Sequence, residues 1–405
     1  MPLLLAENEV RLEYRGLKFR KRRAVLRDTV EKFSEEGATE RYMAQTLQNH
    51  QRWTDHAKGT PGTVRVMAGD WGDVTHHLSA THGHVYAVLN MANAYHPGGG
   101  YLEGMPAQEE NMWYRTNCSF FLKEEEMTAD QHQYTLAATD LINGVQGSVY
   151  LDVTKPRLCI KGSEGSNVTG YADLGSEDYY SFYELKSAAD DLRVESSSFS
   201  EESMRSKIVA QLETLKKNGI RHAVLSAFGC GAFLNPAEEV ARIYKEELQK
   251  RAEDFDDVVF AVYHAGYGSN NFLPFKTVLE GLPLNQTQLA QQKELVTVLT
   301  QTVTDKEWDQ CGIAFLFFDY RKTPNGIVDI RQVLASDQDD FSKIRALKKI
   351  AQYRLDNPPI FTPRDGQVQA LYEQIVKIDV HNMEAALQLF TVDDQPQDVD
   401  QPAPN

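Results

Sequence analysis

What this chain can fold into is constrained most by residues 85–122, VYAVLNMANAYHPGGGYLEGMPAQEENMWYRTNCSFFL. The segment opens with a near-continuous apolar run, which is typical of a strand that is covered on both faces. Three glycines, Gly98 to Gly100, then permit positive φ and a close approach of the backbone to a ligand. Glu109 and Glu110 follow in the first turn of a helix that we expect over 109–126. Carboxylates are favoured there and can project toward whatever the glycines enclose.

This order of features resembles the signature of the poly(ADP-ribose) glycohydrolase (PARG) family, bacterial type, in which GGG and a short spacer precede QEE. The flanking sequences LNMANAYHPGGG and QEENMWYRT strengthen the likeness, as does the helical lead before them. The family is built on the macrodomain, a three-layer α/β/α fold with a mixed central sheet. The resemblance therefore implies this fold, and it covers a little over half of the chain.

The resemblance also implies roles for residues of the segment. Glu110 would be the acid that protonates the leaving atom and then activates water, whereas Glu109 would hold the neighbouring ribose hydroxyls with help from Gln108. Asn93 would bind the distal ribose, and the ligand would approach Gly98, Gly99 and Gly100. Adjacent carboxylates raise each other's pKa, which suits an acid. The alternative is an ordinary acidic pair at a helix start.

A second glycine turn follows a buried strand expected at 222–228 and precedes a helix at 235–250. A strand, a glycine turn and a helix N-terminus together form a ready diphosphate site. AFGCGAFLNP resembles the second phosphate loop of the same family, which implies substrate contacts from Gly229, Cys230, Gly231, Ala232 and Phe233. Phe233 would pack near the ribose or adenine, or else belong to the core. Cys230 is better explained as a small filler than as a nucleophile.

The first strand of the domain is expected at 63–68, and the loop after it contains Asp70 and Asp73. Macrodomains commonly place an aspartate here to accept a hydrogen bond from the adenine amino group, and Asp70 fits slightly better than Asp73. Capping of the next helix is the alternative role. Beyond the signature, the sequence predicts short strands at 147–153 and 157–162, a polar loop at 164–180, helices at 202–217 and 271–279, and a strand at 257–263.

We expect four regions: a helical N-terminal extension at 1–60, a PARG-like macrodomain at 61–281, an accessory α+β domain at 282–390, and a disordered acidic tail at 391–405. The basic run Arg20 to Arg23 is interpreted as a solvated helix face. The accessory domain, with a strand at 312–318 among helices, would recognise a partner protein or extend the packing of the first domain. Asp319 and Asp329 are better explained by solvation than by substrate contact.

Composition narrows the class of protein. The net charge of -16 argues against nucleic acid as the main partner. The four cysteines are widely spaced, without CxxC or Cys/His pairs at metal spacing, so we expect reduced thiols in the cytoplasm and neither metal nor cofactor. The short N-terminal apolar patch contains acidic residues and does not resemble a signal peptide, and no membrane helix is expected.

Two classes of function remain at this point, together with a weaker third. The QEE pair favours a hydrolase that removes ADP-ribose from a modified protein or a polymer over a module that only binds ADP-ribose. In the third, the C-terminal part is a scaffold for a partner. A large acidic chain with such an appendage resembles pathogen effectors of this family that act on ADP-ribosylated ubiquitin. Its place of action would then be the host cytosol, and the scissile bond would join ribose to an arginine guanidinium.

Overall fold

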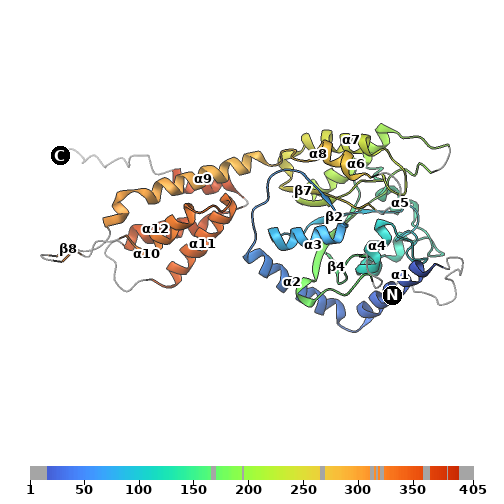
Figure 1. The fold of residues 1–405 in the computed structure, drawn as a ribbon, viewed down its shortest axis with the longest axis horizontal. Helices are drawn as coiled ribbons and strands as arrows, with labels where there is room; N and C mark the ends of the chain where they lie inside the picture. The colour runs from blue at the N-terminus through green and yellow to red at the C-terminus, as the bar shows by residue number, and fades with distance from the viewer. Residues whose placement is uncertain are drawn as a thin grey trace, which may run out of the picture. The chain divides into compact units, whose positions relative to one another are not determined.

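The computed structural model describes residues 16–165, 170–193, 196–264, 270–310, 314–315, 318–319, 323–358, 365–380 and 382–391 (Figure 1). The chain divides into two compact units, Met1–Asn285 and Gln286–Asn405. The expected acidic tail at 391–405 lies outside the described residues apart from Thr391.

A seven-stranded sheet organises the first unit, with strand order β1-β7-β6-β2-β5-β3 and with β4 paired to β5. Strands β1, β7, β6, β2 and β5 are parallel, whereas β3 and β4 run antiparallel to β5. The sheet is therefore mixed, as the sequence predicts. The strands are β1 Arg65–Ala68, β2 Ala87–Met91, β3 Tyr150–Leu151, β4 Arg157–Cys159, β5 Tyr180–Ser187, β6 His222–Leu225 and β7 Asp257–Val262.

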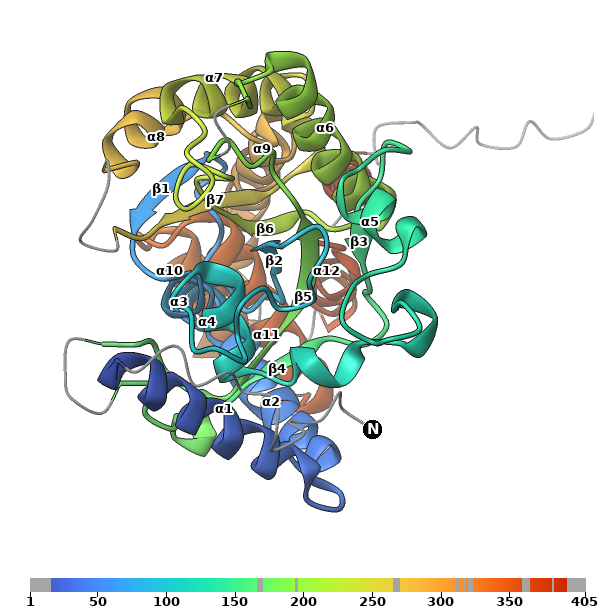
Figure 2. The ribbon, with the colours of Figure 1, turned by 90° about the vertical axis from the view of Figure 1, so that its right-hand side faces the viewer.

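Helices cover both faces of this sheet, so the expected three-layer α/β/α fold is confirmed (Figure 2). On one side lie α6 (Glu201–Lys217), α7 (Ala237–Gln249) and α8 (Phe272–Leu279). On the other lie α3 (Trp71–His82) and α4 (Gln108–Arg115), joined by α1 (Leu17–Ser34) and α2 (Ala38–Asp55). The side chains of β2 alternate between the two cores, with Leu89 in the first and Val88 in the second. This is why the sequence of β2 is apolar at four of its five positions.

Strand β5 is absent from the sequence-based expectations, although it is the longest strand and pairs with β2 from Ala87↔Tyr183 to Met91↔Ser187. Glu184 and Lys186 on this strand are buried, so their charges interrupt the apolar pattern that would reveal a central strand. Helix α5 (Leu136–Ile142) was missed as well. The expected helix over 109–126 ends at Arg115, because Thr116 is extended and forms a bridge with Cys159.

The second unit has its own core, and helices dominate it: α9 Gln286–Thr304, α10 Asn325–Leu334, α11 Asp340–Asp356, α12 Asp365–Lys377 and α13 Met383–Thr391. Leu299, Ile330 and Leu347 from three of these helices are fully buried in that core. In place of the single strand expected at 312–318, β8 (Ala314–Phe315) and β9 (Phe318–Asp319) form an antiparallel pair. Every helix in the described parts of the chain is too short or too polar to cross a lipid bilayer.

Candidate active site

Two glycine loops leave the same edge of the sheet from neighbouring strands. β2 and β6 are parallel and paired at Ala87↔Ala223 and Val88↔Val224, so their carboxyl ends lie side by side. The loop after β2 contains Gly98 to Gly100, and the loop after β6 contains Gly229 to Gly231. Ligands of open α/β sheets bind outside the carboxyl ends of the strands, which is where both loops lie.

The first loop holds the carboxylates of Glu109 and Glu110 through backbone N–H groups. Glu109 accepts hydrogen bonds from the N–H of Asn93 at Oε2 (2.7 Å) and from the N–H of Gly98 at Oε1 (3.1 Å). Glu110 accepts one from the N–H of Gly100 at Oε1 (2.8 Å). Both side chains are buried, 3% and 8% exposed respectively. The two acids in the first turn of α4 therefore face the glycine loop, as the sequence predicts.

Burial controls the ionisation of this pair. Loss of hydration raises the pKa of Glu109 well above its usual range, the neighbouring charge of Glu110 raises it further, and the Asn93 N–H opposes the shift. Burial likewise raises the pKa of Glu110, against the hydrogen bond from Gly100. A carboxyl group that keeps its proton toward neutral pH can act as a general acid.

Side chains of α4 lie directly against two glycines of this loop and leave no room for a Cβ. Gly99 has a φ of +57°, and a Cβ at this position would lie 2.5 Å from Oε1 of Glu110. Gly98 has a φ of +72°, and its Cβ would lie 2.5 Å from the ring of Trp113. Side chains rarely adopt this left-handed conformation, and contacts this short would force the neighbouring Glu110 and Trp113 side chains to move. Glycine at these two positions therefore lets the backbone lie close to the Glu110 carboxylate and the Trp113 ring.

Gln108 and Asn93 bind the backbone around the pair. The amide of Gln108 accepts from the N–H of Met91 (2.9 Å) and donates to the carbonyl of Leu89 (2.9 Å), which fixes the start of α4 beside the end of β2. The Oδ1 atom of Asn93 accepts from the N–H groups of Tyr95 and His96, both at 2.9 Å. Their expected ribose contacts stay predictions.

The second loop is closed by an asparagine. Nδ2 of Asn235 donates to the carbonyls of Asp190 (2.8 Å) and Gly229 (3.1 Å), and Gly229 has a φ of +71°. Cys230 is buried, and burial raises the pKa of its thiol, which fits a filler and not a nucleophile. Gly231 and Ala232 are exposed at the tip of the loop.

The ring of Phe233 lies between the first core and the surface of the second loop. It packs against the first core, and the guanidinium of Arg193 lies 5.1 Å from the ring centroid. The ring is half-buried, so one of its faces is covered by protein. Its role toward a ligand stays a prediction.

Asp70 caps α3, accepting from the N–H groups of Gly72 (2.9 Å) and Asp73 (3.4 Å). The same carboxylate pairs with the buried guanidinium of Arg115, which also lies 3.4 Å from Oδ1 of Asp73. A Cβ on Gly72 would collide with that guanidinium at 2.5 Å, so the pair is tightly enclosed. The capping alternative is thus present, and adenine recognition by Asp70 or Asp73 stays a prediction.

Part of the chain matches a known protein family. Residues 15–142 match the family described as microbial-type PARG, catalytic domain. We call these residues, which are similar to that catalytic domain, the PARG segment. The match contains α1, α2, the first glycine loop and the Glu109–Glu110 pair, and the family is one of glycosyl hydrolases. No curated protein matches the chain.

Two solved structures show the range of structural likeness. The poly(ADP-ribose) glycohydrolase from Thermomonospora curvata bound to the inhibitor ADP-HPD is 19% identical, with a TM-score of 0.44, covering 64% of this chain and 99% of that chain. The enzyme from Deinococcus radiodurans in complex with ADP-ribose is 21% identical, with a TM-score of 0.39, covering 58% and 90%.

The helical lead of the PARG segment supports the first loop through Arg22, which sequence analysis placed on a solvated face. Arg22 is buried and donates through Nη1 to the carbonyl of Gly104 (3.1 Å), and its Nε and Nη2 bind Glu164 at 2.9 and 3.1 Å. Gly104 has a φ of +88° and lies against the carbonyl of Phe19. Arg22 and its exposed neighbour Arg20 differ only in the face of α1 on which they lie relative to α4. The local sequence does not show which face of α1 packs toward α4.

No group of three or more acidic, histidine or cysteine side chains in the described residues is arranged to hold a metal ion.

Proposed function

We propose that this chain is an ADP-ribosyl glycohydrolase, which binds ADP-ribose and hydrolyses the bond from ribose C1 to a modified side chain or polymer. The observation that carries the proposal is the buried Glu109–Glu110 pair, held against the first glycine loop beside the second loop. The family match of residues 15–142 supports the same reaction.

In the proposed mechanism, Glu110 supplies the proton. Its carboxyl group, whose pKa is raised by burial, protonates the leaving atom as the bond to C1 breaks. The resulting carboxylate then takes a proton from the water that attacks C1, which returns Glu110 to its starting state. The positive charge that develops on the ribose ring is stabilised by the negative charge of the ligand's own diphosphate.

Glu109 would orient the ribose. Both of its oxygens already accept a backbone N–H, but each carboxylate oxygen has a further lone pair for a ribose hydroxyl. The diphosphate would lie on the backbone of Gly229 to Phe233 near the N-terminus of α7. Asp70 or Asp73 would accept a hydrogen bond from the adenine amino group of the ligand.

For the substrate, we propose a mono-ADP-ribosylated protein, with arginine as the linkage and ubiquitin as a candidate carrier, acting in the cytosol. The second unit, Gln286–Asn405, supports this choice over a polymer. It has a core of its own, and as a separate folded unit it can contact a carrier protein.

The test is release of ADP-ribose from arginine-, serine- and glutamate-linked protein, including ADP-ribosylated ubiquitin, and from the polymer. Glu110→Gln keeps an acceptor for the Gly100 N–H but has no proton to give, so we expect turnover to fall about 10³-fold while calorimetry still detects ADP-ribose binding. Glu124→Gln, at an exposed site in the same segment, is the matched control. Binding of ADP-ribose without turnover by the wild type would identify a binding module, and no heat with ADP-ribose would refute both.

A further inference from the structure

The first glycine loop carries a third carboxylate, that of Glu103, which the fold itself does not use. Its side chain is partly exposed, and its Oε2 lies 3.7 Å from where a Cβ on Gly100 would be. The N–H of the same Gly100 donates to Oε1 of Glu110 (2.8 Å), so both carboxylates lie beside one residue of the loop. Within the described parts of the chain, the Glu103 carboxylate forms neither a hydrogen bond nor an ion pair.

Tyr101 brings a second polar group to this part of the loop. Its side chain is 8% exposed, and its ring packs against Trp113 with the ring centroids 4.6 Å apart. The hydroxyl has no hydrogen-bond partner among the described residues, and it is not one of the buried atoms left without one, so it is the part of the side chain that solvent reaches. Because polar groups of buried side chains are almost always hydrogen-bonded, the partner of this hydroxyl comes from outside the protein.

Electrostatic effects place both groups next to the acidic pair. Burial, and after it the charges of Glu103 and Glu109, raise the pKa of Tyr101 to about 12. Burial also raises the pKa of Glu110, and the charge of Glu103 adds to that rise. Interactions of this kind are strong only at short range. The Glu103 carboxylate and the Tyr101 hydroxyl therefore lie on the side of the loop where Glu109 and Glu110 are.

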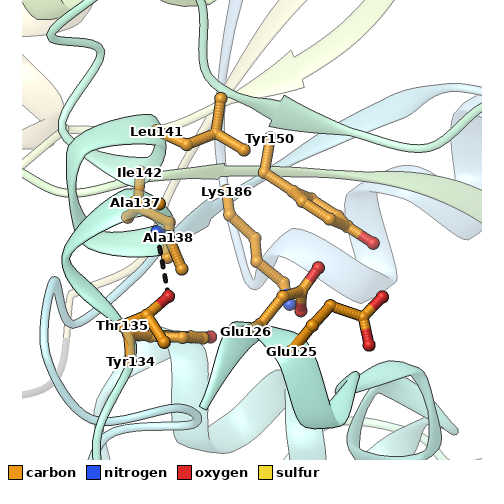
Figure 3. A pocket seen from close by; sticks show the side chains of 10 residues that line it. All are labelled: Glu125, Glu126, Tyr134, Thr135, Ala137, Ala138, Leu141, Ile142, Tyr150 and Lys186. Carbon is orange, nitrogen blue, oxygen red and sulfur yellow. Dashed lines mark hydrogen bonds between the residues drawn. The ribbon is translucent and has the colours of Figure 1, made fainter. Parts of the chain in front are cut away.

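A cavity of about 200 Å³ elsewhere in the first unit offers a contrast (Figure 3). It lies between α5, the 3-10 turn η2 (Glu124–Glu126) and strands β3 and β5, and its surface is almost entirely apolar. The buried cation at its wall, Lys186, lies 3.7 Å from Oε2 of Glu184 and 4.7 Å from the ring centroid of Tyr150. The charge there is matched inside the fold, whereas the charge of Glu103 is left for a partner from outside.

We propose that Glu103 and Tyr101 bind the leaving group of the substrate and select a cationic one, the guanidinium of an ADP-ribosylated arginine. This inference rests on the proposed glycohydrolase function. A carboxylate binds a guanidinium through charge-assisted hydrogen bonds, which can be bidentate. The Tyr101 oxygen can accept a further N–H of the same group.

Other linkages lack this cation. Serine- and glutamate-linked ADP-ribose present neutral oxygen atoms at the same place, and so does the polymer. A guanidinium is charged before the bond to C1 breaks, so the selection is made when the substrate binds. Binding and turnover can therefore be tested separately.

The binding test is calorimetry of the Glu110→Gln full chain with a peptide that carries ADP-ribose on arginine and with the matched peptide that carries it on serine. We expect at least about tenfold higher affinity for the arginine-linked peptide. Adding Glu103→Gln should remove this preference by weakening the arginine-linked peptide alone, and adding Tyr101→Phe should reduce it about threefold. Equal affinities of Glu110→Gln for the two peptides would overturn the inference and leave the proposed function standing, whereas binding of neither peptide would overturn both.

Turnover separates recognition by Glu103 from its electrostatic effect on Glu110. Removing the Glu103 charge lowers the pKa of Glu110, so in Glu103→Gln the alkaline limb of the pH–rate profile should move to lower pH for both linkages alike. At the optimum of the variant, kcat/KM should fall at least about tenfold for the arginine linkage and stay near the wild-type value for the serine linkage. Glu124→Gln, at an exposed site, should change neither. Equal falls for both linkages would mean that Glu103 only supports the loop, which would overturn its role in selection.

Discussion

The two glycine loops differ in what each glycine makes room for. At Gly99 the space is taken by the protein's own acid, since a Cβ would lie 2.5 Å from Oε1 of Glu110. At Gly229, with a φ of +71°, a Cβ would meet the Cβ of Ala189 at 2.5 Å. At Gly231, by contrast, a Cβ would meet nothing within 4 Å.

This difference separates two uses of the same residue type. In the first loop, glycine lets the backbone donate its N–H groups directly to Glu109 and Glu110, and the N–H of Gly100 opposes the rise in the pKa of Glu110 that burial causes. In the second loop, Gly231 is not required by any contact within the fold, and its small size leaves the backbone open to whatever approaches from outside. We therefore propose that the first loop takes part in catalysis and that the second binds the ligand.

Among substitutions in the two glycine loops, the largest expected effect is that of Gly99→Ala. The methyl group would push Glu110 away from the loop, and displacement of a catalytic group by about 1 Å costs ~10²-fold or more in rate. We expect turnover on ADP-ribosylated protein to fall by about this factor. The matched control is Gly147→Ala, because Gly147 has a similar φ of +71° but open space around its Cβ position. Both variants carry the backbone strain, so the contacts with Glu110 and Glu109 distinguish them. Equal activities in the two variants would show that the loop accommodates the methyl group.

A smaller effect is expected from removing the support of the first loop by α1. Arg22→Gln deletes the donor to the Gly104 carbonyl and a positive charge that lowers the pKa of Glu110. Without that charge the pKa of Glu110 rises further, so the acid stays protonated to higher pH. We expect turnover at the optimum to fall about tenfold and the alkaline limb of the pH–rate profile to move upward.

Arg20→Gln is the control for that experiment, because Arg20 belongs to the same basic run but is exposed. Its pH–rate profile should match the wild type. If turnover of Arg22→Gln falls but the alkaline limb of its pH–rate profile does not move, Arg22 acts only by positioning the loop. Its charge would then have no effect on the pKa of Glu110.

The contrast between these arginines shows how far the sequence could predict the site. β2, the glycines and the acidic pair are contiguous, so local pattern was enough to place them on one strand–loop–helix unit. Arg22 and Arg20 differ only in which face of α1 meets α4, and that depends on tertiary packing. Strand β5 could not be predicted for the same reason. Its charged residues Glu184 and Lys186 can be buried because Arg157 and Asn90, from other strands, donate hydrogen bonds to Glu184. The length of α4 was also set non-locally, by the bridge from Thr116 to Cys159.

The smallest expected effect belongs to the second loop and decides whether that loop binds the diphosphate. Gly231→Ala adds a methyl group to open space without backbone strain, so the melting temperature should not change. If the diphosphate of ADP-ribose lies on this backbone, the methyl group occupies part of its volume, and affinity measured by calorimetry should fall about fivefold. Gly366→Ala, in α12 and equally open, should leave the affinity unchanged. Full affinity in Gly231→Ala would mean that the ligand does not approach this loop closely. The resemblance of AFGCGAFLNP to a phosphate loop would then not indicate phosphate binding by this chain.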